Sequence, residues 1–194
     1  MTLMKTIIGK DLSKYSLPVF LNEPLSILQK SAEFLCFADL FEEAVTEPCP
    51  FRRMVLVSTF VASTQWFVVN RTSKPFISML GETFEVVTDK FQYFGENVSQ
   101  QPPIIAFNAR GKGWELNKNV CASMKFTGTQ VNVTDERLAE LKLQIDGKEE
   151  IYTFKSPMMV VGNLLLPNKR YMEGCGAITV ENKTLDIKCE MDFI

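Results

Sequence analysis

The chain has 194 residues, which is the size of one ordinary domain with room for a buried core. Hydrophobic residues make up 46% of it and charged residues 23%, as in a typical globular protein. Its 21 basic and 23 acidic residues leave a net charge of −2, which argues against nucleic acid as the main partner because neutralising phosphates requires a basic field.

The cysteine pattern bears on the cellular compartment and on metal binding. The chain has five cysteines, an odd number, and no two of them form a Cys-x-x-Cys pair. A zinc site or a disulfide framework is therefore not expected, and we expect no metal site. These features favour an intracellular, reducing compartment, with the protein either cytoplasmic or peripheral to a membrane.

Two segments bear on targeting and on membrane spanning. Near the N-terminus, Lys5, Lys10 and Asp11 fall too early for the apolar core of a signal peptide. The longest uncharged run, Met54–Asn70, contains several Ser, Thr and Gln residues, whereas a spanning helix needs about 20 mostly apolar residues. We predict a buried helix there, no transmembrane helix and a soluble protein.

The N-terminal third of the chain shows helical periodicity. Residues 1–15 form a short amphipathic segment whose apolar residues, spaced by three and four, share one helical face. These residues are Leu3, Met4, Ile7 and Ile8. An extended stretch, 17–24, is marked by two prolines. Ser26 can then cap a helix that runs to about Val45, and after two further prolines a second helix is predicted from Arg52 to about Asn70.

After Lys74 the periodicity changes to that of short strands, which are β-branched or aromatic and separated by turn residues such as Asp146-Gly147. The predicted strands are 82–87, 91–94, 104–109, 120–126, 130–133, 140–145, 150–154, 158–166, 176–180 and 184–193. Residues 135–141 could instead form a helical turn. Strands at this spacing indicate an antiparallel meander that curls into a sandwich or a barrel.

Residues 96–103 carry the most specific motif, Glu-Asn-Val-Ser-Gln-Gln-Pro-Pro. It resembles the signature of the oxysterol-binding-protein-related lipid carriers, Glu-Gln-Val-Ser-His-His-Pro-Pro. Two further blocks are similar to that family and occur in the same order. One is Gly-Lys-Asp-Leu-Ser at 9–13, followed by Pro-Val-Phe-Leu-Asn-Glu-Pro-Leu-Ser at 18–26; the other is Lys-Pro-Phe-Ile-Ser-Met-Leu-Gly-Glu-Thr-Phe-Glu at 74–85. The resemblance covers nearly the whole chain.

The resemblance implies a β-rich α+β fold. An N-terminal lid and two helices would be followed by an antiparallel β-meander that forms a partial, incomplete β-barrel around an apolar tunnel. The domain organisation expected is a single truncated domain over 1–194, with the lid and extended segment at 1–24, helices at 25–73 and the partial barrel at 74–194. The family domain continues past the position of Ile194, so a dimer mate or another protein is expected to cover the open barrel edge.

The resemblance also implies site residues. Lys74 matches a family lysine that helps to bind lipid phosphate, although a solvated loop lysine is the alternative reading. Gln100 and Gln101 replace the family's histidine pair, and Ile77 replaces an asparagine that contacts the headgroup. The segment from Leu3 to Ile8 matches the end of the family lid, and a helix docked on any apolar groove would show the same pattern.

The functional expectation is therefore lipid binding. The family tunnel holds one sterol or the acyl chains of one phospholipid, and many members also exchange phosphatidylinositol 4-phosphate; here that binding and exchange are expected to be lost. The alternative is a structural subunit of a larger assembly that reuses the fold. An enzyme is not expected, because the chain has no histidine, nucleophile elbow or phosphate loop. We expect no cofactor apart from a bound sterol or phospholipid, with lipid, a protein partner and peripheral membrane contact as the interactions.

Overall fold

The computed structural model describes residues 19, 22–68, 71–163 and 169–193. The lid expected at Leu3, Met4, Ile7 and Ile8 lies outside the described residues and stays a prediction. The division of the chain into lid, helical and barrel segments likewise remains a prediction.

The described chain begins with strand β1 (Asn22–Ser26) and continues into three α-helices, α2 (Ile27–Glu33), α3 (Asp39–Thr46) and α4 (Pro50–Ser63). Ser26 caps α2 as predicted: its Oγ accepts from the Gln29 backbone N at 3.2 Å, and Gln29 Oε1 accepts from the Ser26 backbone N at 2.8 Å. This reciprocal capping box satisfies backbone donors that the first turn leaves free. Pro50 occupies the first turn of α4, where its missing N–H is not needed.

The prediction of one continuous helix from Ser26 to about Val45 is wrong. A 3₁₀ segment, η3 (Phe34–Phe37), separates α2 from α3. In a 3₁₀ turn, side chains three positions apart lie above one another, so Phe34 and Phe37 both reach Phe67, with ring centroids 6.1 and 5.8 Å from it. Phe67 lies in a second 3₁₀ segment, η4 (Thr64–Val68), which ends the helix that was predicted to run on to Asn70.

Thirteen strands lie in the described residues. Besides β1 they are β2 (Lys74–Phe76), β3 (Thr83–Val87), β4 (Phe91–Gln100), β5 (Pro103–Gly111), β6 (Trp114–Val120), β7 (Ser123–Phe126), β8 (Val131–Thr134), β9 (Ala139–Ile145), β10 (Lys148–Phe154), β11 (Met158–Gly162), β12 (Tyr171–Asn182) and β13 (Ile187–Phe193). β1 and β2 form a small parallel pair that the sequence pattern did not predict. The other eleven form one antiparallel sheet in the order β3-β4-β5-β6-β9-β10-β12-β11-β8-β7, with β13 on the second edge of β12.

One strand prediction is wrong, and so is the helical alternative for 135–141, whereas the strand predicted at 140–145 is confirmed as β9. The strand predicted at 120–126 is wrong in its first half: β6 lies before it, at Trp114–Val120, and was not predicted, while β7 starts only at Ser123. Between them the Cys121 backbone N donates to Asp135 Oδ1 at 3.2 Å and not to a neighbouring strand. The helical turn considered for 135–141 does not form, since residues from Ala139 onward pair with β6 and β10. The predicted Asp146-Gly147 turn is confirmed, with positive φ at both residues as a tight hairpin requires.

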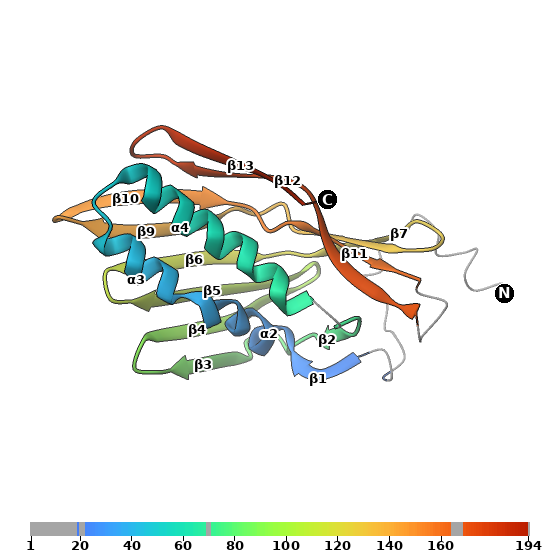
Figure 1. Ribbon diagram of the computed structural model, residues 1–194. Coiled ribbons are helices and arrows are strands. Elements are labelled where there is room, and N and C mark those ends of the chain that lie inside the picture. The colour runs from blue at the N-terminus through green and yellow to red at the C-terminus, as the bar shows by residue number, and fades with distance from the viewer. Residues whose placement is uncertain (1–18, 20–21, 69–70, 164–168, 194) are drawn as a thin grey trace.

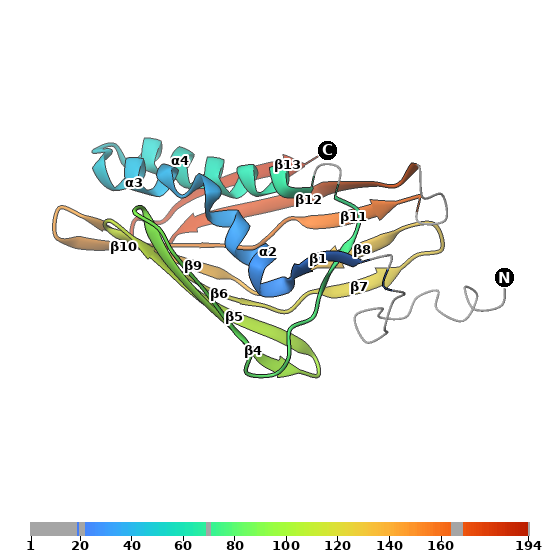
Figure 2. The same ribbon diagram turned by 90° about the horizontal axis from the view of Figure 1, so that it is seen from below.

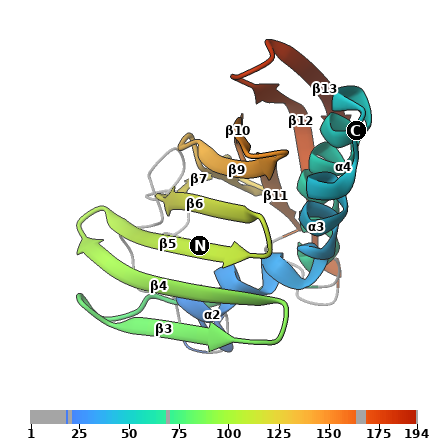
Figure 3. The same ribbon diagram turned by 90° about the vertical axis from the view of Figure 1, so that its left-hand side faces the viewer.

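The sheet is strongly curved and does not close, so the predicted partial barrel is confirmed. Figure 3 shows it bending around α3 and α4, with β3 at one end and β13 at the other. Among the described residues, the outer edges of β3, β7 and β13 have no strand partner. None of the described helices is long and apolar enough to cross a membrane.

The main core lies between the curved sheet and helices α3 and α4, which run along it in Figure 1. Phe41 of α3 packs against Phe60 of α4, with ring centroids 4.1 Å apart and the rings tilted by 40°, and contacts Trp114 of β6 at 5.2 Å. Helix α2 is joined to β4 by a hydrogen bond between the Tyr93 hydroxyl and Ser31 Oγ, which are 2.6 Å apart. Burial raises the pKa of Tyr93 to about 12, so this contact stays neutral near pH 7.

A buried ion pair joins the helices to the sheet. Arg53 of α4 is 5% exposed, and its Nη2 and Nε donate to the two carboxylate oxygens of Glu150 in β10 at 2.5 and 3.2 Å. Its Nη1 also donates to the carbonyls of Glu47 and Pro48, at 2.8 and 3.0 Å, in the loop between α3 and α4. Burial alone would lower the pKa of the guanidinium, but the bonds and charge of Glu150 raise it.

The Glu150 carboxylate also accepts hydrogen bonds from two residues of the sheet. Glu150 Oε2 accepts from the Tyr152 hydroxyl at 2.8 Å and from Asn182 Nδ2 at 3.1 Å. Asn182 Oδ1 in turn accepts from the backbone N–H groups of Thr184 and Leu185, which form the β12–β13 turn. Burial and the neighbouring carboxylate raise the pKa of Tyr152 to about 12, so it serves as a neutral donor.

A second charged cluster fixes the segment that leads into β2. Glu23 of β1 accepts from Lys30 of α2 at 2.6 Å and from Arg71 at 2.8 Å, and Arg71 also donates to Glu33 at 2.5 Å. The Glu23 and Lys30 side chains are each 11% exposed. Burial would raise the pKa of Glu23, but the hydrogen bonds from Lys30 and Arg71 outweigh it and hold the pKa below its usual value.

Removing one partner of the buried pair should destabilise the fold strongly. We expect Arg53→Met to lower the free energy of unfolding by about 3–5 kcal/mol, because Glu150 would remain buried without a counter-charge. Urea unfolding followed by tryptophan fluorescence measures this. Adding Glu150→Gln to Arg53→Met should recover part of the loss. Lys90→Met, which removes an exposed pair with Asp39, is the control and should change stability by less than about 1 kcal/mol.

The Glu23 cluster should make stability depend on pH in the acid range. A carboxyl whose pKa is lowered on folding contributes its stability above the unfolded value near 4.5 and loses it as the pH falls through the folded value. At pH 7 we expect Glu23→Gln to be less stable than the wild type by about 1–3 kcal/mol. The gap should shrink steadily below pH 4.5 in urea titrations. A gap that stayed constant down to acid pH would contradict this role.

Candidate functional site

The two best-matched sequence motifs meet in space. The segment that follows β2 folds against the end of β4, and in Figure 2 it runs down beside β4 to the lower edge of the molecule. The backbone carbonyl of Ser78 accepts from two side chains of β4, Asn97 Nδ2 at 2.5 Å and Gln100 Nε2 at 2.7 Å. The predicted site residue Gln100 therefore uses one of its two amide N–H donors within the protein.

Backbone bonds complete this junction. The Gly81 backbone N donates to the Asn97 carbonyl at 2.8 Å, and the Asn97 backbone N donates to the Glu82 carbonyl at 3.0 Å. Within the turn, the Glu82 backbone N donates to the Met79 carbonyl at 3.0 Å, while Glu82 Oε2 accepts from the Met79 backbone N at 2.8 Å. Gly81 has a φ of +77° with no neighbour near a would-be Cβ, so glycine serves the turn here and not close packing.

The other predicted site residues are less enclosed. Gln101 is exposed and is joined to Pro102 by a cis peptide bond at the start of the β4–β5 turn. Ile77 is 41% exposed and its side chain offers no hydrogen bond. Lys74 is half-buried at the start of β2, in register with Asn22 of β1. Gln100 is thus bonded to Ser78, the residue that follows Ile77 in the chain. Lys74 lies on the same segment, three positions before Ile77.

Sequence reasoning missed Asn97 and Ser78, although both are at the centre of the junction. They are 1% and 3% exposed, and Asn97 stands where the family signature has glutamine, which is the signal that could have identified it. Ser78 Oγ and Asn97 Oδ1 have no hydrogen-bond partner among the described residues, and neither has Gln65 Oε1, which packs on Gly174. Buried oxygens of this kind are suited to a water or a ligand hydroxyl.

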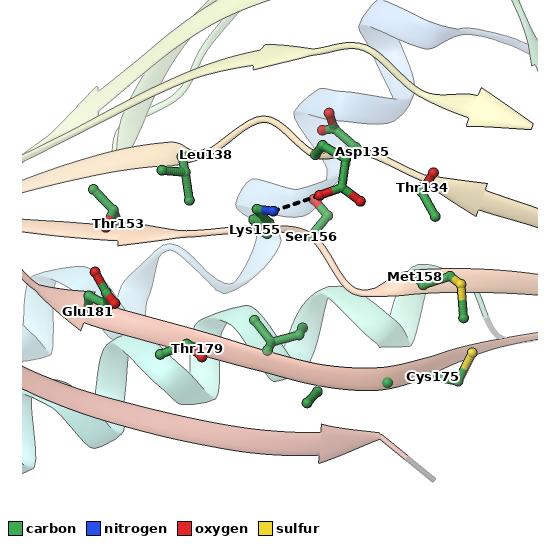
Figure 4. Close-up of a pocket in the computed structure, with 14 residues that line it drawn as sticks. Thr134, Asp135, Leu138, Thr153, Lys155, Ser156, Met158, Cys175, Thr179 and Glu181 are labelled. Atoms are coloured by element: carbon green, nitrogen blue, oxygen red, sulfur yellow. Dashed lines mark hydrogen bonds and ion pairs between the residues drawn. The ribbon is translucent and has the colours of Figure 1, made fainter.

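Two cavities, of about 510 and 450 Å³, lie on the outer face of the sheet. Of the residues in the two matched motifs, Glu96 alone lines one of them, the smaller cavity. The larger one lies where β10 and β11 part along β12, between the register pairs Phe154↔Val180 and Met158↔Cys175. In Figure 4 the helices lie behind the strands that carry its lining residues, so the cavity faces away from the core.

Polar contacts hold the segment between β10 and β11, beside this cavity. Lys118 Nζ lies 3.0 Å from Asp135 Oδ2 and donates to Ser156 Oγ at 2.6 Å, and both charged side chains are 8% exposed. Burial raises the pKa of the Cys175 thiol in the cavity wall, with a smaller effect from Glu173, which makes it a poor nucleophile. The contacts of Lys118 with Asp135 and Ser156 join the segments on either side of the strand break. Within the described part of the chain, no cluster of His, Cys, Asp and Glu could hold a metal ion.

Comparison with known proteins bears directly on these motifs. The family model described as oxysterol-binding protein matches residues 1–194. The chain is 36% identical over 194 residues to oxysterol-binding protein homolog 2 of Saccharomyces cerevisiae, covering 98% of this chain and 15% of that protein. It is 33% identical over 199 residues to human oxysterol-binding protein-related protein 2, covering 99% of this chain and 40% of that protein.

The fold also aligns with solved structures of the same family. The Osh1 ORD domain in complex with cholesterol aligns with a TM-score of 0.92 at 33% identity, over 99% of this chain and 47% of that one. The Osh3 ORD of Saccharomyces cerevisiae in complex with PI(4)P aligns with a TM-score of 0.81 at 32% identity, over 94% of this chain and 49% of that one. The chain thus spans less than half the length of these relatives. Its full-length match to the family model and its identity to these proteins show that it belongs to the oxysterol-binding protein family.

Proposed function

We propose that this chain binds the apolar body of one lipid molecule, a sterol or a phospholipid, and has lost phosphatidylinositol 4-phosphate binding and exchange. The observation that carries the lipid-binding proposal is the close alignment with an ORD domain that holds cholesterol. The driving force would be burial of apolar lipid surface, at roughly 25 cal/mol per Å². Such a role is that of a binding protein and not of an enzyme.

The loss of headgroup binding is supported by the junction between the motifs. Gln100 and Gln101 are uncharged, where the family has histidines, and the amide of Gln100 already donates to the Ser78 carbonyl. Ile77 contributes no polar contact. Charge-assisted hydrogen bonds contribute about 1.5–3 kcal/mol each against about 0.5–1.5 for neutral ones, so two replacements weaken phosphate binding roughly ten- to a hundredfold.

Lys74 remains the one cation among the predicted site residues. A lysine ammonium can attract a lipid phosphate as a point charge without the geometric demands of an arginine. We propose this role for Lys74, with a modest contribution to phospholipid binding and none to sterol binding. The lid residues would close over the bound lipid.

The alternative function is that of a structural subunit in a larger assembly. It is favoured by the open eleven-stranded sheet, in which the outer edges of β3, β7 and β13 have no strand partner among the described residues. Unpaired edges invite pairing with another chain, which a protein partner or a dimer mate would satisfy.

Lipid binding is tested on the purified chain. We expect one sterol or phospholipid to co-purify and to be detected by mass spectrometry, and a fluorescent sterol to be taken up from cyclodextrin. Ile7→Asp with Ile8→Asp should speed release of that sterol if these residues form the lid, whereas Thr6→Asp in the same segment is the control. A lipid-free chain that takes up no sterol would contradict the proposal. If that chain also formed a stable oligomer in light-scattering measurements, the subunit alternative would be supported.

Restoring the histidines should not restore headgroup binding. We expect Gln100→His with Gln101→His to leave binding to phosphatidylinositol 4-phosphate liposomes as weak as in the wild type, because Ile77 still offers no hydrogen bond. The double variant should also lose the Gln100 amide bond to Ser78 and so be slightly less stable, by about 0.5–1.5 kcal/mol. Tight binding by the double variant would mean that the glutamines alone account for the loss.

A further inference from the structure

The turn between β2 and β3 displays an unusual set of apolar side chains. Residues 75–81 carry no charge. Four of their side chains are exposed to a large extent, and Val98 of β4 lies on the strand to which this turn is bonded. The exposed fractions are 43% for Phe76, 41% for Ile77, 74% for Met79, 65% for Leu80 and 46% for Val98. We call these five residues the apolar turn surface.

This display is held by the junction already described. Ser78, between Ile77 and Met79, faces inward, and its carbonyl accepts from Asn97 and Gln100. The Met79 backbone N and the Gly81 backbone N are also bonded within the protein. A bulge in β4 between Asn97 and Ser99 turns Val98 outward. The polar backbone groups named here are thus paired internally, while the apolar side chains point out.

We infer that the apolar turn surface inserts into the headgroup–acyl boundary of a lipid bilayer; this rests on the proposed lipid-binding function. Entry into that boundary requires that backbone polar groups be paired and that charges be kept away. The first condition is met at Met79 and Gly81, whose backbone N–H groups donate to Glu82 Oε2 and to the Asn97 carbonyl. The second is met over residues 75–81, which carry no charge; the carboxylate that follows them, Glu82, is bonded back to the turn and would lie at the headgroup level. The surface lies on the motif junction itself, so a bilayer touching it would be in contact with the segment that carries the predicted lipid contacts.

A bilayer suits this surface better than a protein partner does. Stable protein interfaces involve roughly 20–30 residues from each partner, whereas the apolar turn surface is one short turn and a neighbouring side chain. The net charge of −2 gives no general attraction to anionic lipid. Insertion should therefore depend on apolar contact, occur on neutral phosphatidylcholine vesicles and respond little to salt.

The test is flotation of the full chain with phosphatidylcholine vesicles at low and high salt. Met79→Asp with Leu80→Asp should reduce the bound fraction at least roughly tenfold, because two inserted side chains would become charged. The control is Phe51→Asp with Val55→Asp, which places the same charges on equally exposed apolar residues of α4, 67% and 61% exposed. The control variant should float like the wild type.

Sterol uptake from cyclodextrin, measured without vesicles, separates this inference from the proposed function. The Met79/Leu80 variant should take up sterol like the wild type while failing to float. No uptake by the wild type would reject the proposed function, whatever the vesicles show. The inference is overturned if the wild type does not float or if the Met79/Leu80 variant floats normally. It is equally overturned if this variant changes only the oligomeric state, which would assign the surface to a protein contact.

Discussion

The Arg53–Glu150 ion pair is the contact on which the arrangement of helices and sheet depends. The two residues are 97 positions apart and almost fully buried, so both charged groups are desolvated. Such a pair is tolerated only when the remaining donors and acceptors are also satisfied. Here the guanidinium also binds the carbonyls between α3 and α4, and the carboxylate also binds Tyr152 and Asn182. One carboxylate thus fixes α4, β10 and the β12–β13 turn relative to one another.

The motif junction follows the same rule with weaker groups. The buried Ser78 carbonyl accepts hydrogen bonds from the side-chain amides of Asn97 and Gln100. These two bonds join the segment after β2 to the end of β4. The side chain that the family resemblance marks as a headgroup contact is used here to hold the scaffold. The neutral amide is well matched to this task, since a carbonyl needs a donor and not a charge.

The junction also explains why apolar side chains can stay exposed in the turn. An exposed apolar loop would usually relax and cover itself, but this one is fixed at Ser78, Met79 and Gly81 by bonds to β4 or within the turn. The apolar turn surface therefore stays exposed because the turn that carries it is held rigidly at the motif junction. The ion cluster around Glu23 fixes the other end of the same segment, so both its approach and its turn are set by buried polar contacts.

From the sequence alone one could predict the helical region before Lys74 and the antiparallel strands after it, the family, the capped start of α2 at Ser26 and the tight turn at Asp146-Gly147. These depend on local spacing, on short motifs and on backbone preferences that neighbouring residues impose. Three features could not be predicted from the sequence: the break of the first helix at Phe34–Phe37, the end of β6 at Val120 and the bond from Gln100 to Ser78. Each of those outcomes depends on a partner distant in sequence: Phe67 for the helix, Asp135 for the strand and Ser78 for the glutamine. A contact of this kind leaves no periodic trace in the chain, because its energy exists only once the fold has brought the two segments together.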